Sequence, residues 1–324
     1  MTGDPRVSVV VRAYNEARHI GRLLEGIRRQ TVQDVEVVLV DSGSTDATVD
    51  IAREYGARIV TIAPQEFTFG RALNRGIAAA RGSFIVVASA HVYPVYPDWL
   101  ERLLEPFADP RVALTYGKQR GNATTKFSEH QIFAAWFPDG HGPQYQDHPF
   151  CNNANAAIRR SLWEQHPYDE TLPGLEDIAW AKWALEQGYA VVYVPEAEII
   201  HVHEETWSQI YNRYRREAMA LKQIYPHTRF GFFDFLRLWW SNVWHDWRTA
   251  RQQGAFRARW LEILRFRFWQ FWGTYQGHRL EGPLTAQLRR TFYYPRRPED
   301  VRARPRPVPP LVYDDAPSVS RREG

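Results

Sequence analysis

Three short apolar runs near the start of the chain each lead directly into a cluster of polar residues. The runs and their clusters are 7–11 with 12–16, 37–40 with 41–46, and 84–88 with 89–91. Apolar runs with little polar interruption are typical of parallel strands that are covered on both faces. Ligands of such sheets bind beyond the carboxyl ends of the strands, where these clusters would gather. The pattern therefore predicts a nucleotide site at one edge of a sheet.

Helical periodicity separates these strands. Apolar residues recur on one helix face between the first two runs, at Ile20, Leu23, Leu24 and Ile27. Further helices are expected around 51–55, ended by Gly56, and 73–80, with a strand over 58–62 between them. This alternation of strand and helix predicts an α/β fold, a sheet flanked by helices.

The middle third of the chain is less regular. Strands are expected over 112–116 and over 190–194, the second closed by Pro195, and helices over 127–137 and 177–186. A polar loop rich in His, Gly and Pro precedes Phe150. From Trp207 the pattern becomes helical, aromatic and basic.

These shifts in composition divide the chain. We expect a catalytic domain over 1–206, with a nucleotide-binding half over about 1–92 and an acceptor half over about 93–206. A helical aromatic-basic region follows over 207–293, and a tail over 294–324, rich in Pro and Arg, is predicted to be disordered.

The composition is that of a globular protein. Hydrophobic residues make up 44% and charged residues 24% of the 324, and the single cysteine, Cys151, excludes an internal disulfide. The N-terminus shows no apolar signal core, and no uncharged apolar run has the length of a membrane span. We expect a cytoplasmic protein, with the inner face of the cell membrane as a second place of action.

Asp41 stands at the end of a predicted buried strand. Its carboxylate can accept hydrogen bonds from a base or from ribose hydroxyls, and the small residues after it allow close backbone approach. The alternative is that Asp41 and Asp46 shape a turn and cap the next helix. The matching cluster at Tyr14 and Glu16 favours a nucleoside pocket. A G-x-G-x-x-G fingerprint is absent after these strands, which disfavours a nicotinamide or flavin enzyme.

A positively charged helix face follows the loop that contains Phe67 and Phe69. Arg71 and Arg75 lie four residues apart, on one side of the predicted helix. They could meet a diphosphate, Arg71 more readily because it is nearer the N-terminal end. The alternative is a solvated surface face.

Three histidines are candidate metal ligands. Ser89-Ala90-His91 follows the last early strand, where Mg²⁺ or Mn²⁺ would favour carboxylates. His91 could bind Mn²⁺ or donate to a departing phosphate, or it could be an ordinary loop histidine. His201 and His203 point to the same face if they lie on a strand, and could supply one ligand.

Glu176 and Asp177 open a predicted helix. As a structural feature they would cap it and favour its N-terminal dipole. As a functional feature, one carboxylate would take a proton from an attacking hydroxyl. A cap needs only one acid, so the pair favours function.

Taken in order, these motifs resemble the family 2 glycosyltransferases, in particular their bacterial rhamnosyltransferase-like branch. The resemblance spans about 7–214 and rests on 10–16, 40–46, 67–76, 152–156 and 174–177. It implies a GT-A fold, Rossmann-like with a mixed sheet flanked by helices. It also implies an inverting transferase that moves one hexosyl or deoxyhexosyl unit from a nucleotide-diphosphate sugar to a hydroxyl of a glycan or lipid-linked saccharide.

The resemblance also implies roles for residues. The nucleoside and donor would be held by Ala13, Tyr14, Glu16, Asp41, Ser42, Ser89 and Ala90, with Arg71 near the diphosphate. Asp177 would be the base, with Glu176 beside it. The side chains towards the acceptor would be those of Asn153, Asn155 and Trp180. Ser89-Ala90-His91 takes the place of the family's Asp-x-Asp motif, and His201 or His203 that of its later histidine ligand.

Both aspartates of that metal motif are missing here, which leaves the need for Mn²⁺ or Mg²⁺ open. Two alternatives follow: a metal-independent transferase, and a non-catalytic protein that binds nucleotide sugars. The signature of processive synthases is only approximated at 209–214, so a non-processive enzyme is expected.

The late aromatic-basic stretch over 230–275 has three interpretations. It could lie on a membrane surface as interfacial helices, pack on the catalytic domain, or form a homodimer. Nucleic acid is not an expected partner, because the basic residues form no dense patch.

Overall fold

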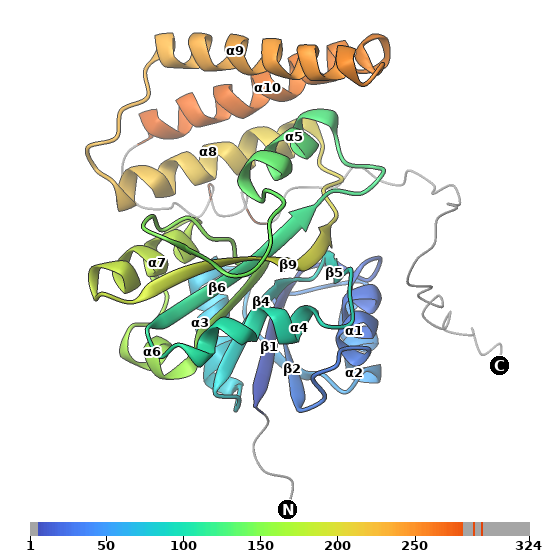
Figure 1. Ribbon diagram of the computed structural model, residues 1–324, viewed down its shortest axis with the longest axis vertical. Helices are drawn as coiled ribbons and strands as arrows, with labels where there is room; N and C mark the ends of the chain where they lie inside the picture. Colours follow the sequence, from blue (N-terminus) through green and yellow to red (C-terminus); the bar gives the residue numbers. More distant parts are fainter. Residues whose placement is uncertain (1–5, 281–287, 289–292, 294–324) are drawn as a thin grey trace, which may run out of the picture.

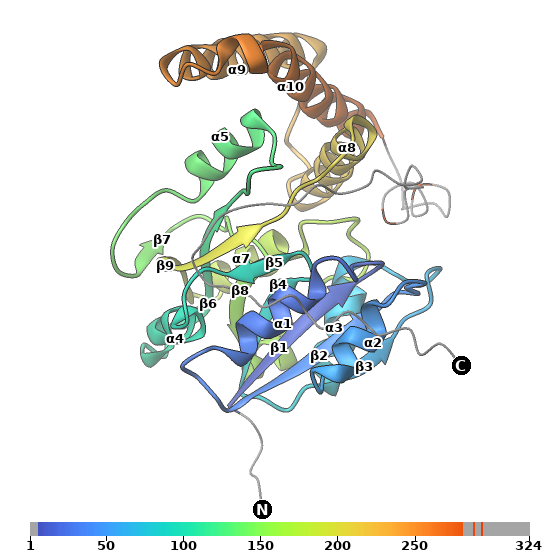
Figure 2. The same cartoon turned by 90° about the vertical axis from the view of Figure 1, so that its right-hand side faces the viewer.

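The computed structural model describes residues 6–280, Leu288 and Tyr293. A twisted sheet with helices on both faces forms one part, and long helices stack beyond one end of it (Figures 1 and 2). The expected α/β architecture is confirmed. The expectation of a disordered tail over 294–324 lies outside the described residues.

The sheet has the strand order β3-β2-β1-β4-β8-β6-β9-β5, with β7 paired to β9. Strands β1 to β4 are parallel to their neighbours among themselves, as the apolar runs predict, whereas β8 is antiparallel to both β4 and β6. The strands are β1 Val7–Ala13, β2 Val35–Asp41, β3 Arg58–Thr61, β4 Phe84–Ser89, β5 Val92–Pro94, β6 Val112–Arg120, β7 Gln144–Gln146, β8 Asn155–Arg159 and β9 Ala190–His201.

Helices cover both faces of this sheet because its strands are apolar on both sides. Val10 and Val38 pack in one core with Leu73 of α3, while Val9 and Leu39 pack in the other with α1 and α4. The α-helices are α1 Ile20–Arg28, α2 Thr48–Glu54, α3 Phe69–Ala79, α4 Trp99–Leu104, α5 Phe127–Trp136, α6 Arg160–Gln165, α7 Glu176–Glu186, α8 Trp207–Ile224, α9 Phe232–Gln252 and α10 Phe256–Arg279.

Strand β9 is longer than the sequence suggests. The prediction that Pro195 closes it is wrong, because the ladder with β6 is irregular at this point. Val194 pairs with Gly117, and the next paired residues are Ile199 and Gln119, so the proline lies in a bulge and need not donate to the ladder. The extended strand pairs His201 with Val92, the first residue of β5, directly after His91.

The long helices form a stack in which α8 packs on α10 and α10 packs on α9, while α5 contacts both α9 and α10. A buried ion pair lies inside this stack. Arg267 of α10 donates to both carboxylate oxygens of Asp246 on α9, at 2.7 and 3.0 Å, and Ser128 of α5 donates to the same group at 2.6 Å. No helix in the described part of the chain is both long and apolar enough to cross a bilayer.

Replacing Asp246 by Asn should destabilise the protein by about 3–5 kcal/mol, because Arg267 would remain buried without its counter-charge. The two side chains are only 0% and 5% exposed, so water cannot compensate. Urea unfolding measures the loss. Asp50→Asn, at a position that is 73% exposed, is the matched control and should change stability by less than about 0.5 kcal/mol. Equal unfolding midpoints for the two variants would contradict this reading of the stack.

Candidate active site

A pocket of about 260 Å³ lies at the carboxyl ends of β1, β2 and β4, between these ends and helix α8. The loops after the three strands deliver their polar side chains to it. The residues expected from the sequence that line it are Ala13, Tyr14, Glu16, Ser42, Ser89 and His91.

Side-chain hydrogen bonds hold the loops after β1 and β2 together. The backbone N–H of Asn15, a residue at a φ of 54°, donates to Ser44 Oγ at 2.9 Å, and that of Glu16 donates to Thr48 Oγ1 at 2.7 Å. The carboxylate of Asp41 accepts from the N–H groups of Gly43 and Ser44 at 3.1 and 3.2 Å. Asp41 therefore shapes the turn that presents Ser42, and lies outside the pocket wall.

The positive charge of the pocket comes from other residues than expected. Arg71 donates to Glu170 at 2.7 Å and to the carbonyl of Glu66 at 2.9 Å, and it is absent from the pocket lining. The guanidinium groups that do line the pocket are those of Arg12, Arg213 and Arg216. The last two share a polar face of α8 with Gln209 and Asn212. These four polar residues recur at three- and four-residue intervals, as on one face of a helix, and this pattern in the sequence could have indicated the pocket wall.

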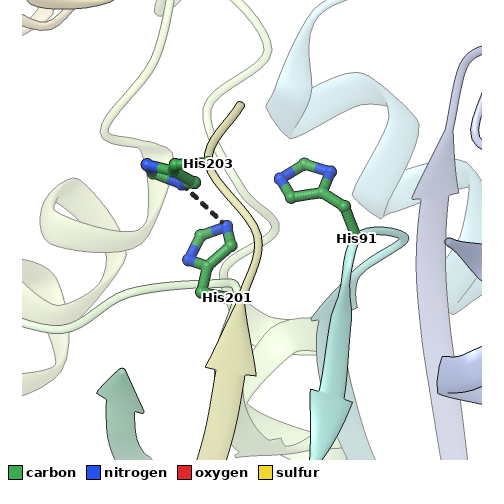
Figure 3. Close-up of side chains that lie close together, drawn as sticks. All are labelled: His91, His201 and His203. Atoms are coloured by element: carbon green, nitrogen blue, oxygen red, sulfur yellow. Dashed lines mark hydrogen bonds between the residues drawn. The ribbon is translucent and has the colours of Figure 1, made fainter. Parts of the chain in front are cut away.

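Three histidines from distant parts of the chain meet beside the pocket (Figure 3). A potential ligand nitrogen of each lies within 4.8 Å of those of the other two. Nε2 of His201 and Nε2 of His203 are 3.0 Å apart, and the ring of His91 lies 5.0 Å from that of His201. From the sequence we expected one metal ligand from His201 and His203. In the structure both lie in one cluster with His91.

The opposite nitrogen of each ring has an oxygen partner. Nδ1 of His91 lies 3.2 Å from Glu16, Nδ1 of His201 lies 2.7 Å from Gln119, and Nδ1 of His203 lies 2.9 Å from Glu129. Such partners orient metal-binding imidazoles and set their tautomer.

The charges and burial around His201 favour a neutral imidazole ring, whose nitrogen lone pair can bind a metal ion. Burial, together with His203 and His91, holds the pKa of His201 well below its usual value, so that this ring is neutral. Burial opposes ionisation of Glu129, yet Arg213 and His203 keep the pKa of this carboxyl low. Three imidazole nitrogens fit a borderline transition ion such as Zn²⁺, and accept Mn²⁺, better than they fit Mg²⁺, which favours oxygen.

The two carboxylates at the start of α7 are held differently. Glu176 accepts from Arg12 at 3.2 Å and from the Asn153 amide side chain at 3.3 Å. Asp177 accepts from the backbone N–H groups of Asn153 and Ile178, at 2.9 Å each. Burial, and next the adjacent charge of Glu176, raise the pKa of Asp177 to about 7.

Arg12 connects this acid pair to the pocket. Its guanidinium lines the pocket, lies 4.4 Å from the ring centre of Phe69, and bonds to Glu176. Asp177, which is 8% exposed, therefore lies behind the pocket wall on the side of Arg12.

The remaining residues that we expected to bind donor or acceptor are buried in the protein core. Asn155 is fully buried, donates to the carbonyl of Ala197 at 2.8 Å and accepts from Trp99 at 2.8 Å. Trp180 is 1% exposed and donates to the carbonyl of His166 at 2.7 Å. Ala90 is also 1% exposed. None of the three reaches the pocket lining, because their elements form the core behind it.

Comparison with known proteins identifies the relatives of this chain. Residues 8–166 match the family described as Glycosyl transferase family 2. O-antigen chain rhamnosyltransferase WbaN of Salmonella anatum is 29% identical over 65% of this chain and 70% of its own length. O-antigen chain rhamnosyltransferase RfbN of Salmonella typhimurium is 24% identical over 64% and 70%, respectively.

Among solved structures, the mannosyltransferase PcManGT from Pyrobaculum calidifontis, in complex with GDP-Man and Mn²⁺, is similar in fold. The two chains align with a TM-score of 0.56 at 22% identity, over 85% of this chain and 86% of the other.

The raised pKa of Asp177 should appear in the pH dependence of stability. The unfolded chain releases this proton near a pKa of about 3.9, whereas the folded protein keeps it until about pH 7. The contribution of Asp177 to the free energy of unfolding is therefore complete below about pH 4, and is lost as the pH rises through 7.

Denaturant unfolding of the wild type and of Asp177→Asn between pH 4 and 8 measures this effect. The wild type should lose stability relative to the variant as the pH rises, by at most about 1.4 kcal/mol per pH unit. Parallel pH profiles of the two proteins would exclude a proton held by Asp177.

Proposed function

Since this chain belongs to the family 2 glycosyltransferases through residues 8–166, we propose that it transfers one sugar, with inversion, from a nucleotide-diphosphate sugar to a hydroxyl of a saccharide. The observation that carries the proposal is the contact of Arg12 with both the pocket and the Glu176–Asp177 pair. The similarity to two O-antigen chain rhamnosyltransferases favours a deoxyhexose as the sugar and a polysaccharide or its lipid-linked precursor as the acceptor.

The donor occupies the pocket at the carboxyl ends of the strands. Ala13, Tyr14, Glu16 and Ser42 surround the nucleoside, because they come from the two loops that are bonded to each other. The diphosphate lies towards Ser89 and α8, where Arg213 and Arg216 face the pocket. Asp41 and Arg71 act indirectly, by holding the turn and the loop behind this wall.

Asp177 is the general base of the transfer. The acceptor hydroxyl gives its proton to this carboxylate as its oxygen forms a bond to the anomeric carbon, and the bond from that carbon to the diphosphate breaks on the opposite side. A pKa of about 7 leaves the group ionised in a useful fraction at neutral pH and basic enough to take a proton. Arg12 compensates the charge of Glu176, which keeps Asp177 from being protonated at still higher pH.

A divalent ion fits beside this pocket, with His91, His201 and His203 as ligands. When bound, it would cancel charge on the departing diphosphate. Glu16, Gln119 and Glu129 hold the three rings through Nδ1, so that Nε2 is the nitrogen that would coordinate. An ion would replace the present contact between Nε2 of His201 and Nε2 of His203. A metal-independent transferase is the alternative, in which Arg213 and Arg216 alone meet the diphosphate.

Asp177→Asn should lower the transfer rate by about 10²–10⁴, the usual contribution of a general base, while nucleoside diphosphate affinity stays within about twofold. Transfer from radiolabelled nucleotide sugars and calorimetric titration with UDP, GDP and dTDP measure the two quantities. The same exchange at Asp169, an acid outside the pocket lining, is the matched control and should leave both unchanged. Full activity of Asp177→Asn would remove the proposed base, and lost nucleotide binding would mean a structural defect.

Removal of His201 should weaken binding of a divalent ion. On metal-stripped protein, calorimetry should show one site for Zn²⁺ or Mn²⁺ and much weaker binding of Mg²⁺. His201→Ala should raise the dissociation constant by more than about tenfold, since loss of an outer partner alone costs 10–100-fold. His148→Ala, an exposed histidine outside the cluster, is the control. Identical titration curves for both variants would favour the metal-independent transferase.

A further inference from the structure

The outermost helices carry large apolar side chains on their exposed surface. Phe233 is 84% exposed, and five further aromatic or aliphatic side chains are 37–48% exposed. These residues are Phe232, Trp240, Trp244, Trp260 and Leu236, which with Phe233 we call the docking face. They lie on α9 and the first half of α10, the layer farthest from the sheet (Figures 1 and 2).

The docking face stands in a strongly basic surrounding. Residues 231–280 contain eight arginines and three acidic residues, a net charge of +5. The whole chain carries only +4, so this segment accounts for all of its excess positive charge. The buried pair of Asp246 and Arg267 is neutral, which leaves seven arginines against two acids towards the surface.

We propose that the docking face binds the surface of a bilayer that contains anionic phospholipids. Indole rings partition into the interface between water and hydrocarbon, where the N–H group stays solvated, and phenyl rings bury at the boundary of headgroups and acyl chains. Arginines beside them meet lipid phosphates, and each basic residue near an anionic surface adds to the attraction. The aromatic rings of this outer helix layer match the apolar part of such a membrane surface, and its arginines match the negative charge of the lipid headgroups.

A second copy of the chain fits this face less well. An isologous dimer places the same patch on both subunits, so the arginines of one would face the arginines of the other. Single-stranded nucleic acid needs open ring faces for stacking. The rings of Trp240, Trp244 and Trp247 instead pack edge to face, with centroids 5.8–6.1 Å apart.

The helices that carry the docking face contact the wall of the proposed active site. Helix α10 packs on α8, and another side of α8 lines the pocket. A second cavity of about 440 Å³ lies among α8, α9 and α10, lined by Trp207, Trp239, Phe268, Trp269, Leu264 and Arg265. Trp207 is two residues from both Glu205 and Gln209 of the active-site wall. A lipid-linked acceptor would therefore reach the pocket from the membrane side, a consequence that rests on the proposed function, whereas the docking itself does not.

Co-sedimentation of the full chain with vesicles tests the proposal. The protein should bind vesicles of phosphatidylcholine with phosphatidylglycerol, bind pure phosphatidylcholine much less, and be released by salt. The double variant Trp240→Ser, Trp244→Ser should lose at least tenfold in affinity for the mixed vesicles. Tyr96→Ser, which removes a ring that is 47% exposed on the catalytic domain, should bind like the wild type.

A second variant separates docking from misfolding. Arg248→Gln with Arg257→Gln keeps every ring, and should weaken binding to the mixed vesicles by about fivefold for each charge. Nucleoside diphosphate binding should be unchanged in all variants. Equal vesicle binding by wild type and both double variants would overturn the proposal. So would light scattering that shows a dimer lost in the tryptophan variant, or binding of oligonucleotides in place of vesicles.

Discussion

Two adjacent carboxylates that open one helix in the protein core impose the strongest constraint on this structure. Glu176 and Asp177 cannot both be ionised there at low cost, because burial and their proximity penalise the second charge. Arg12 stabilises the ionised form of Glu176 through a contact of 3.2 Å. Ionisation of Asp177 is therefore the one that is disfavoured. The same arginine lies near the carboxyl end of strand β1 and lines the pocket, so the acid pair, this strand and the pocket wall depend on one guanidinium.

The sequence predicts the parallel half of the sheet because that half depends on local patterns. Apolar runs gave β1, β2 and β4 with their polar ends, and the family resemblance gave the residues that follow them. The antiparallel half depends on long-range pairing instead. Strand β8 is a short segment between two neighbours, and β9 passes a proline because a bulge accommodates it, neither of which a local pattern reveals.

The same distinction applies to the candidate site. His91, His201 and His203 could be named from the sequence, but their meeting depends on the extra length of β9. Arg71 was expected at the diphosphate, yet Glu170, 99 residues away in the chain, engages it. The pocket-facing side of α8 was missed because the helix was interpreted through its aromatic residues, and its polar face with Arg213 and Arg216 received no role. This helix joins the two proposals, since one side lines the pocket and another side packs on α10, which carries part of the docking face.

The anomeric configuration of the product tests the central claim most directly. Both oxygens of Asp177 are held by backbone N–H groups behind the pocket wall, a position suited to taking a proton and unsuited to attacking a sugar carbon. With a donor of known configuration, NMR of the isolated product gives the configuration of the new glycosidic bond. The account predicts the opposite anomer to that of the donor. A product with retained configuration would require a covalent or front-side route and would contradict it.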